Sequence, residues 1–223
     1  MLGCALAAGV APAGAQTPPT PAEFSAYSGL FAAAQQGELA AIERLVAVSR
    51  AALSARDGNG RTPLHVATFA RQRGAVTRLL ALGADAALLD NDRYDAVTIA
   101  AVADDEETLR ILLRDGASAR LVTSRYDGTA LIAAAHLGHD GVVRQLIAAG
   151  APLDHVNNLH WTALIEAVVL GDGGARHQRV VKALLDAGAN IALTDVQGRT
   201  ARDLAQARGY AAMVKSIEAR ARR

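Results

Sequence analysis

Apolar and polar positions along this chain follow the period of short amphipathic helices that come in pairs. Leu64 and Ala67 fall on one apolar stripe, and Val76, Leu79 and Leu80 fall on a second stripe. Apolar residues three and four positions apart predict helices, because one helical turn takes about 3.6 residues. Polar stretches with Asn, Asp or Gly follow each pair and are typical of turns. The pattern therefore predicts units of two short helices and a turn.

This unit recurs along the chain. The segment "DGNGRTPLHVA" at residues 57–67 returns as "DNDRYDAVTIA" at residues 90–100, an offset of 33 residues. Further copies begin at Ser124, Asn157 and Asp195. The end of the second stripe also repeats, with glycines at Gly83, Gly116, Gly150 and Gly188. Repeats of this length predict a solenoid, in which each unit buries its apolar face against its neighbours.

The sequence also marks where the helices begin and end. In four copies a threonine precedes the apolar run and can cap the exposed amides of a helix start: Thr62, Thr129, Thr162 and Thr200. Pro63 falls in a first turn, where its missing N–H costs nothing. The four repeated glycines lie where the C-terminus of a helix favours a left-handed residue.

The segment "TPLHVA" at Thr62–Ala67, together with the Gly-Ala pairs, resembles the ankyrin repeat over about Leu30 to Ile217. The resemblance implies an all-α ankyrin-repeat solenoid of about six helix-turn-helix repeats with short β-hairpin loops. The stretch "LFAAAQQGELAAIERLV" is the expected N-terminal cap. The last copy ends in charged residues, which give a terminal repeat the polar outer face that it needs for solubility. We expect a repeat domain at 28–223, with repeats at about 28–56, 57–89, 90–123, 124–156, 157–194 and 195–223.

Composition favours a helical fold and also narrows the class of partner. The chain is 51% hydrophobic but only 4% aromatic, which favours closely packed helices of small residues over a sandwich or barrel. The formal net charge is +1, and no concentrated positive charge of the kind that nucleic-acid binding needs is present. We therefore expect no nucleic-acid partner.

The first 15 residues have the features of an export signal. No Asp, Glu, Lys, Arg or His precedes Glu23, and the apolar run "LGCALAAGVA" is too short to span a bilayer. Ala13 to Ala15 have the small-x-small form of a cleavage site, although the usual basic segment is missing. We expect a signal peptide at 1–15, a linker at 16–27 and a periplasmic or secreted protein. The alternatives are a lipid anchor on Cys4 and, if the signal does not work, a cytoplasmic protein.

The fifth repeat carries an insertion. Thr162 and Gly188 are 26 residues apart, whereas the corresponding positions in earlier repeats are 21 apart. The five extra residues, "DGGAR" at Asp172–Arg176, are expected to form an extended loop between the two helices. The segment lacks the Lys-Ser/Thr of a phosphate-binding loop and the spaced acids of a calcium loop. A secondary contact site is the alternative.

Candidate chemistry is sparse. His65 belongs to the "TPLH" segment and is expected to order the turn between repeats. His136 and His139 are close enough to share a face, but a zinc site needs further ligands and Asp140 is the only acid nearby. The acids "DDEE" at 104–107 suit the start of a helix. We expect no catalytic residue, metal or cofactor, and an enzyme built on the His136 region or the "GDGG" loop is the least favoured alternative.

The family resemblance implies a partner-binding surface along the hairpin tips and first helices. Aromatic and arginine residues, which dominate interface hot spots, fall at variable positions of that surface. The expected partner-binding residues are Arg61, Phe69, Arg93, Tyr94, Arg125, Tyr126, His136, His160, Trp161 and Arg199. For Tyr94 and Trp161, packing against neighbouring hairpins is the alternative role.

These patterns together predict a non-catalytic, exported module that binds a protein partner and is itself a monomer. The sequences of several segments, among them "NDRYDAVTIAAV" and "RHQRVV", resemble those of a family of exported bacterial ankyrin proteins. The alternative function is an accessory or protective factor for an exported enzyme or toxin. A neighbouring gene that encodes such a partner would distinguish the two.

Overall fold

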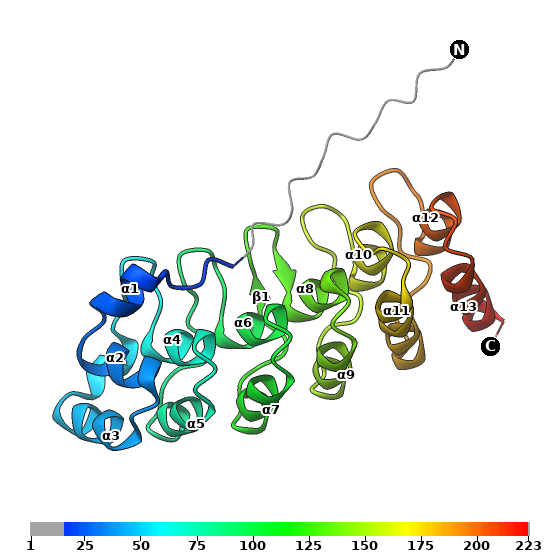
Figure 1. The fold of residues 1–223 in the computed structure, drawn as a ribbon. Coiled ribbons are helices and arrows are strands. Elements are labelled where there is room, and N and C mark those ends of the chain that lie inside the picture. Colours follow the sequence, from blue (N-terminus) through cyan, green and yellow to red (C-terminus); the bar gives the residue numbers. More distant parts are fainter. Residues whose placement is uncertain (1–15, 223) are drawn as a thin grey trace, which may run out of the picture.

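The computed structural model describes residues 16–222, which form one row of stacked helix pairs (Figure 1). In each pair an inner helix lies next to the loops and an outer helix lies away from them. The inner helices are α2 (Gly29–Gln36), α4 (Pro63–Phe69), α6 (Ala96–Val102), α8 (Ala130–Leu137), α10 (Ala163–Val169) and α12 (Ala201–Ala207). The outer helices are α3 (Leu39–Val48), α5 (Arg73–Ala81), α7 (Glu106–Arg114), α9 (Asp140–Ala148), α11 (Ala175–Ala187) and α13 (Ala211–Ala221).

Each inner helix contacts the next inner helix, and each outer helix contacts the next outer helix. The core between the two rows consists almost entirely of Ala, Leu, Val and Ile. Small side chains let short helices approach closely, so every repeat buries its apolar face against its neighbours. The predicted all-α solenoid is confirmed. Within residues 16–222, no helix is long and apolar enough to cross a membrane.

The helix ends follow the predicted signals. The side chains of Thr62, Thr129, Thr162 and Thr200 each accept a hydrogen bond from the amide three residues further on. Asp95 does the same at the start of α6. Such caps are worth about 1 kcal/mol each. The repeated glycines are left-handed as predicted, with φ between +77° and +96°. The acids before α7 also act as expected, because Asp105 caps that helix.

The loops between repeats are hairpins that hydrogen-bond to one another. The clearest is the antiparallel pair of β1 (Val122–Thr123) and β2 (Gly128–Thr129). Backbone bonds join successive hairpin tips: Asn91 N to Asn59 O at 3.0 Å, Ser124 N to Arg93 O at 2.8 Å, and Asn158 N to Tyr126 O at 3.0 Å. These bonds hold the hairpins as one wall, beside the wall formed by the inner helices.

His65 orders one of these turns, as predicted. Its Nδ1 accepts from the backbone N–H of Thr62 at 2.9 Å, and its Nε2 lies 3.1 Å from the Tyr94 carbonyl of the next hairpin. The two contacts need opposite proton roles, which a neutral imidazole supplies. Burial lowers the pKa of His65 to about 4, so the ring stays neutral.

The N-terminal stretch differs from the expected linker. The predicted signal peptide, 1–15, lies outside the described residues. Residues 21–26 form helix α1, which is capped by Thr20 and begins with a proline. The segment before it, residues 16–20, is extended but lies against the repeats, so that the side chains of Gln16 and Pro19 are buried. The chain therefore covers part of its own loop side.

The insertion of the fifth repeat also differs from its prediction. An extended loop at 172–176 is wrong in part, because α11 already begins at Ala175 and is 13 residues long, against 9 for α9. Part of the insertion therefore adds a helical turn. Arg176 donates to the Gly138 carbonyl at 3.0 Å and pairs with Asp104 at 2.6 Å. The added turn links the fifth repeat to the fourth and the third.

Candidate binding groove

The hairpins and the inner helices border a groove, and Arg61 and Phe69 lie at its N-terminal end. Arg61 is engaged by Thr17 and Glu23 of the N-terminal stretch. The Arg61 side chain is only 1% exposed and pairs with Glu23 at 3.1 Å and Asp57 at 3.3 Å. It also donates to the Thr17 carbonyl at 2.7 Å, and its guanidinium carbon lies 5.8 Å from the centre of the Phe69 ring. Arg61 is therefore closed to a partner while the segment 16–20 stays in place, whereas Phe69 is half-buried.

Five of the predicted binding residues lie along the hairpins. Three arginines there pair with acids: Arg93 with Asp127 at 2.8 Å, Arg125 with Asp92 at 3.6 Å, and Arg199 with Asp195 at 2.7 Å. His160 is exposed and has a positive φ of 60°. Trp161 is half-buried and packs against the core. The tips thus offer an exposed polar rim, and their role in binding stays a prediction.

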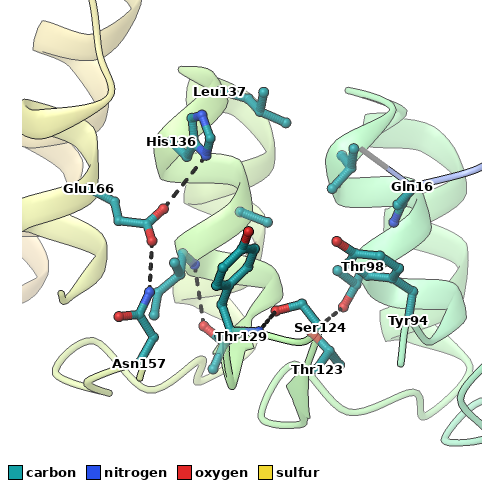
Figure 2. A pocket seen from close by; sticks show the side chains of 15 residues that line it. Gln16, Tyr94, Thr98, Thr123, Ser124, Thr129, His136, Leu137, Asn157 and Glu166 are labelled. Carbon is teal, nitrogen blue, oxygen red and sulfur yellow. Dashed lines mark hydrogen bonds and ion pairs between the residues drawn. The ribbon is translucent and has the colours of Figure 1, made fainter. Parts of the chain in front are cut away.

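The remaining three predicted residues, Tyr94, Tyr126 and His136, meet in one cavity (Figure 2). The cavity has a volume of about 200 Å³ and lies between hairpins and inner helices. Gln16 lines one side, beside Tyr94 and Thr98. The buried Nε2 of Gln16 has no hydrogen-bond partner among residues 16–222. Gln16, the first described residue of the extended N-terminal segment, therefore lies in this cavity.

Glu166, on α10, lies at the opposite side of the cavity (Figure 2). Its Oε1 accepts from Asn157 Nδ2 at 2.8 Å, and its Oε2 lies 3.7 Å from His136 Nδ1, too far for a hydrogen bond. Burial raises the pKa of Glu166 to about 7, and the Asn157 hydrogen bond offsets part of that effect. Burial also lowers the pKa of His136, as do His177 and His139 to a smaller degree.

Glu166 and Asn157 were not predicted from the sequence, although both stand out when the repeats are aligned. The position of Glu166 is apolar in the other copies: Val66, Ile99, Ala133 and Leu204. The position of Asn157 holds Asp57, Asp90, Ser124 and Asp195. Asn157 keeps the role of the aspartates, because its Oδ1 accepts from the amides of Leu159 and Trp161 at 3.0 Å. The side-chain NH2 of Asn157, which an aspartate lacks, donates to Glu166. The two residues that differ from the repeat pattern are therefore in contact.

The cavity holds a carboxyl group and an imidazole, but the second histidine of the predicted pair does not join them. The Nδ1 of His139 lies 2.9 Å from the Ala101 carbonyl. Two hydroxyls of the cavity wall, on Ser124 and Thr129, accept hydrogen bonds from the Tyr126 and Ile132 amides. Nor do three His, Cys, Asp or Glu side chains converge as a metal site anywhere in residues 16–222. The groups present suit recognition of a ligand.

The stacked helix pairs and the hairpin wall define an α-solenoid repeat protein with a groove between its hairpins and inner helices. A family model for three ankyrin repeats matches residues 30–123 and 97–195, so the chain belongs to the ankyrin repeat family. The YahD ankyrin repeat protein of Escherichia coli K12 is 34% identical over 80% of this chain and 88% of its own length. Ankyrin repeats are in general a non-catalytic, protein-binding fold.

Solved structures agree with this assignment. An ankyrin repeat domain from Acinetobacter baumannii superimposes with a TM-score of 0.80 and 40% identity, over 86% of this chain and 97% of that one. A chain in the complex of a predatory endopeptidase from Bdellovibrio bacteriovorus with an immunity protein gives a TM-score of 0.70. It covers 86% of this chain and 98% of that one. Its 24% identity shows a shared fold alone.

Proposed function

We propose that the protein is an exported, monomeric, non-catalytic module that binds an extended segment of a partner protein in the groove between its hairpins and inner helices. One observation carries the proposal: this groove already holds an extended segment, residues 16–20 of the chain itself. A main-chain carbonyl of that segment accepts from Arg61, and the side chain of Gln16 enters the cavity. A partner segment can use the same two kinds of contact.

The rigid arrangement of the groove supports this function. Hydrogen bonds between hairpin tips and the continuous core hold both walls in place before a partner arrives. Preorganised surfaces lose little conformational entropy on binding, so contacts translate more fully into affinity. Tyr126 is half-exposed on the cavity wall, and its side chain is free to contact a ligand without supporting the core.

The test is capture of a partner from a periplasmic extract by the full chain, beside Tyr126→Ala and Arg110→Ala. Arg110 is 58% exposed on α7, in the outer row, so its variant is the matched control. We expect the wild type and Arg110→Ala to capture the same protein, and Tyr126→Ala to lose at least about tenfold in affinity. Equal capture by all three, with folding confirmed by circular dichroism, would place the binding site outside the groove.

Export is part of the same proposal and rests on the sequence of residues 1–15. Mass spectrometry of the protein from a periplasmic fraction should find Gln16 as the first residue. A protein recovered only from the cytoplasm with its first residues intact would refute it. The alternative function, protection of an exported enzyme or toxin, is compatible with the fold shared with the endopeptidase–immunity protein complex. It predicts that the captured partner is encoded by a neighbouring gene.

A further inference from the structure

The size of the Glu166 cavity suits one amino-acid side chain. Its volume of about 200 Å³ exceeds the roughly 150 Å³ of an engineered cavity that binds benzene. It is smaller than the roughly 300–1,000 Å³ of pockets that hold drug-sized molecules. Figure 2 shows Gln16 and Glu166 on opposite sides, with the ring of Tyr94 beside Gln16 and that of His136 beside Glu166. A long, narrow group that enters beside Gln16 can therefore point toward Glu166.

The lining combines apolar walls with one acid. Val102 and Ile132 contribute apolar surface, and Tyr94 and Tyr126 contribute aromatic rings. Glu166 is the only acidic side chain among the lining residues, and within residues 16–222 its Oε2 has no hydrogen-bond donor within 3.5 Å. Lysine and arginine match this lining, because an apolar stem carries a cationic, hydrogen-bond-donating head that can also lie near aromatic faces.

We propose that this cavity is the specificity pocket of the groove and receives a lysine or arginine side chain of the partner, whose cationic head pairs with the Glu166 carboxylate. The inference rests on the proposed groove-binding function and adds the chemistry that selects the partner. An acidic side chain would be repelled by Glu166, and an apolar one would leave the buried carboxylate without a countercharge. The pocket therefore discriminates by charge.

Three departures from the repeat pattern build this pocket together. Ala133 replaces larger apolar residues found at the same position in other repeats, and this opens space against α8. Glu166 supplies the acid in the next repeat. Asn157 replaces the usual aspartate and holds the carboxyl by donating to it at 2.8 Å. A buried acid retained without a countercharge is costly for stability, which argues that the acid serves a ligand.

Gln16, which lines the pocket, fits this chemistry only weakly. Gln16 brings an amide N–H donor into the cavity, but its Nε2 finds no acceptor among the described residues. A neutral amide cannot neutralise a carboxylate, whereas a cationic head can. A partner segment with a basic residue can thus take the place of Gln16 with a net gain in electrostatic pairing.

The test uses side-chain analogues, so it needs no partner. Butylammonium and propylguanidinium stand for lysine and arginine, 1-butanol is the neutral analogue, and butyrate is the anionic one. The full chain, Gln16→Ala and Glu166→Gln are titrated at pH 8 by NMR, through the amide signals of residues that line the cavity. We expect both cations to shift these signals saturably and to bind at least about tenfold more tightly than butanol or butyrate. Gln16→Ala should tighten cation binding, and Glu166→Gln should remove the preference.

Three outcomes would overturn the inference. Equal binding of butanol and butylammonium, or the same cation preference in Glu166→Gln, would show that Glu166 does not select charge. Absence of cation binding to both the wild type and Gln16→Ala would show that the cavity does not admit such a group, with or without its present occupant. If the cation selectivity is not found but Tyr126→Ala loses the partner, the groove function is supported and the pocket is not. Selective cation binding without any captured partner would instead support the pocket and count against the groove function.

Discussion

Arg61 and Glu166 are buried charged side chains at opposite ends of one groove, in the second and fifth repeats. Arg61 meets two carboxylates and a carbonyl oxygen, all within 3.3 Å. Glu166 meets one amide donor at 2.8 Å and an imidazole at 3.7 Å. The cation is therefore neutralised inside the chain, while the anion is hydrogen-bonded but has no cation beside it among residues 16–222.

The difference indicates separate roles for the two residues. A buried charge with several partners fixes the structure around it, and here Arg61 fastens the segment 16–20 and the turn at Asp57. A buried charge that lacks a countercharge destabilises the free protein, and such groups gather at sites that bind or react. Both residues lie in the same groove, but in the proposed complex only Glu166 gains a partner.

The largest expected effect comes from removing the charge of Arg61. The variant Arg61→Met keeps an apolar stem over Phe69 but leaves the Asp57 carboxylate without its countercharge and the Thr17 carbonyl without its donor. We expect the free energy of unfolding to fall by about 4 kcal/mol, because removal of one member of a buried ion pair leaves the other unpaired. Urea denaturation measures the change. A loss below about 1 kcal/mol would show that Arg61 does not hold this end of the groove.

Glu166 is expected to behave in the opposite way, since neutralising it should stabilise the protein. Its pKa is about 7 in the folded state against an ordinary value of 4.5. The folded state therefore holds a proton more tightly than the unfolded state, and this contribution to stability is lost as pH rises from about 4.5 through 7. At pH 8 the cost is about 3 kcal/mol. Glu166→Gln should remove it.

The measurement is the difference in unfolding free energy between Glu166→Gln and the wild type at pH 5 and at pH 8. Other groups also titrate in this range, but those that do not contact Glu166 cancel in the difference between the two proteins. We expect a small difference at pH 5 and a stabilised variant at pH 8. A difference that does not change with pH would mean that Glu166 is ionised at low cost, and the contrast with Arg61 would disappear.

Most of the fold could be predicted from the sequence, because each repeat carries local signals for where its helices begin and end. Thr62 and Gly83 mark a helix start and a helix end by local chemistry, and the same chemistry returns in other copies. What the sequence missed depends on contacts between distant residues. Local spacing does not reveal that residues 16–20 lie in the groove or that Arg61 is buried beneath them.

The same limit applies to the pocket. The aromatic and histidine residues Tyr94, Tyr126 and His136 were predictable as groove residues from their repeat positions, and the structure brings them together. Glu166 and Asn157 are unusual only when each is compared with its counterparts in other repeats. Their contact is visible only in three dimensions, because nine residues separate them and a helix start intervenes.

The smallest of these effects concerns Asn157, and it tests whether the two departures in the fifth repeat are matched. Asn157→Asp restores the usual residue but places a second carboxylate against Glu166. At pH 8 we expect a loss of about 2 kcal/mol, because a hydrogen bond to a charged group becomes a like-charge contact. The sixth repeat pairs an aspartate, Asp195, with an apolar residue, Leu204, at the same two positions.

The control for this prediction is the double variant Asn157→Asp/Glu166→Leu, which gives the fifth repeat the pair found in the sixth. If the two residues are matched, the aspartate substitution should cost little in the Glu166→Leu background, so that the double-mutant cycle yields a coupling of about 2 kcal/mol. Additive effects would mean that Asn157 serves its hairpin alone. Coupling would instead show that the Asn157 side-chain amide stabilises the Glu166 carboxyl, as a pocket built around Glu166 requires.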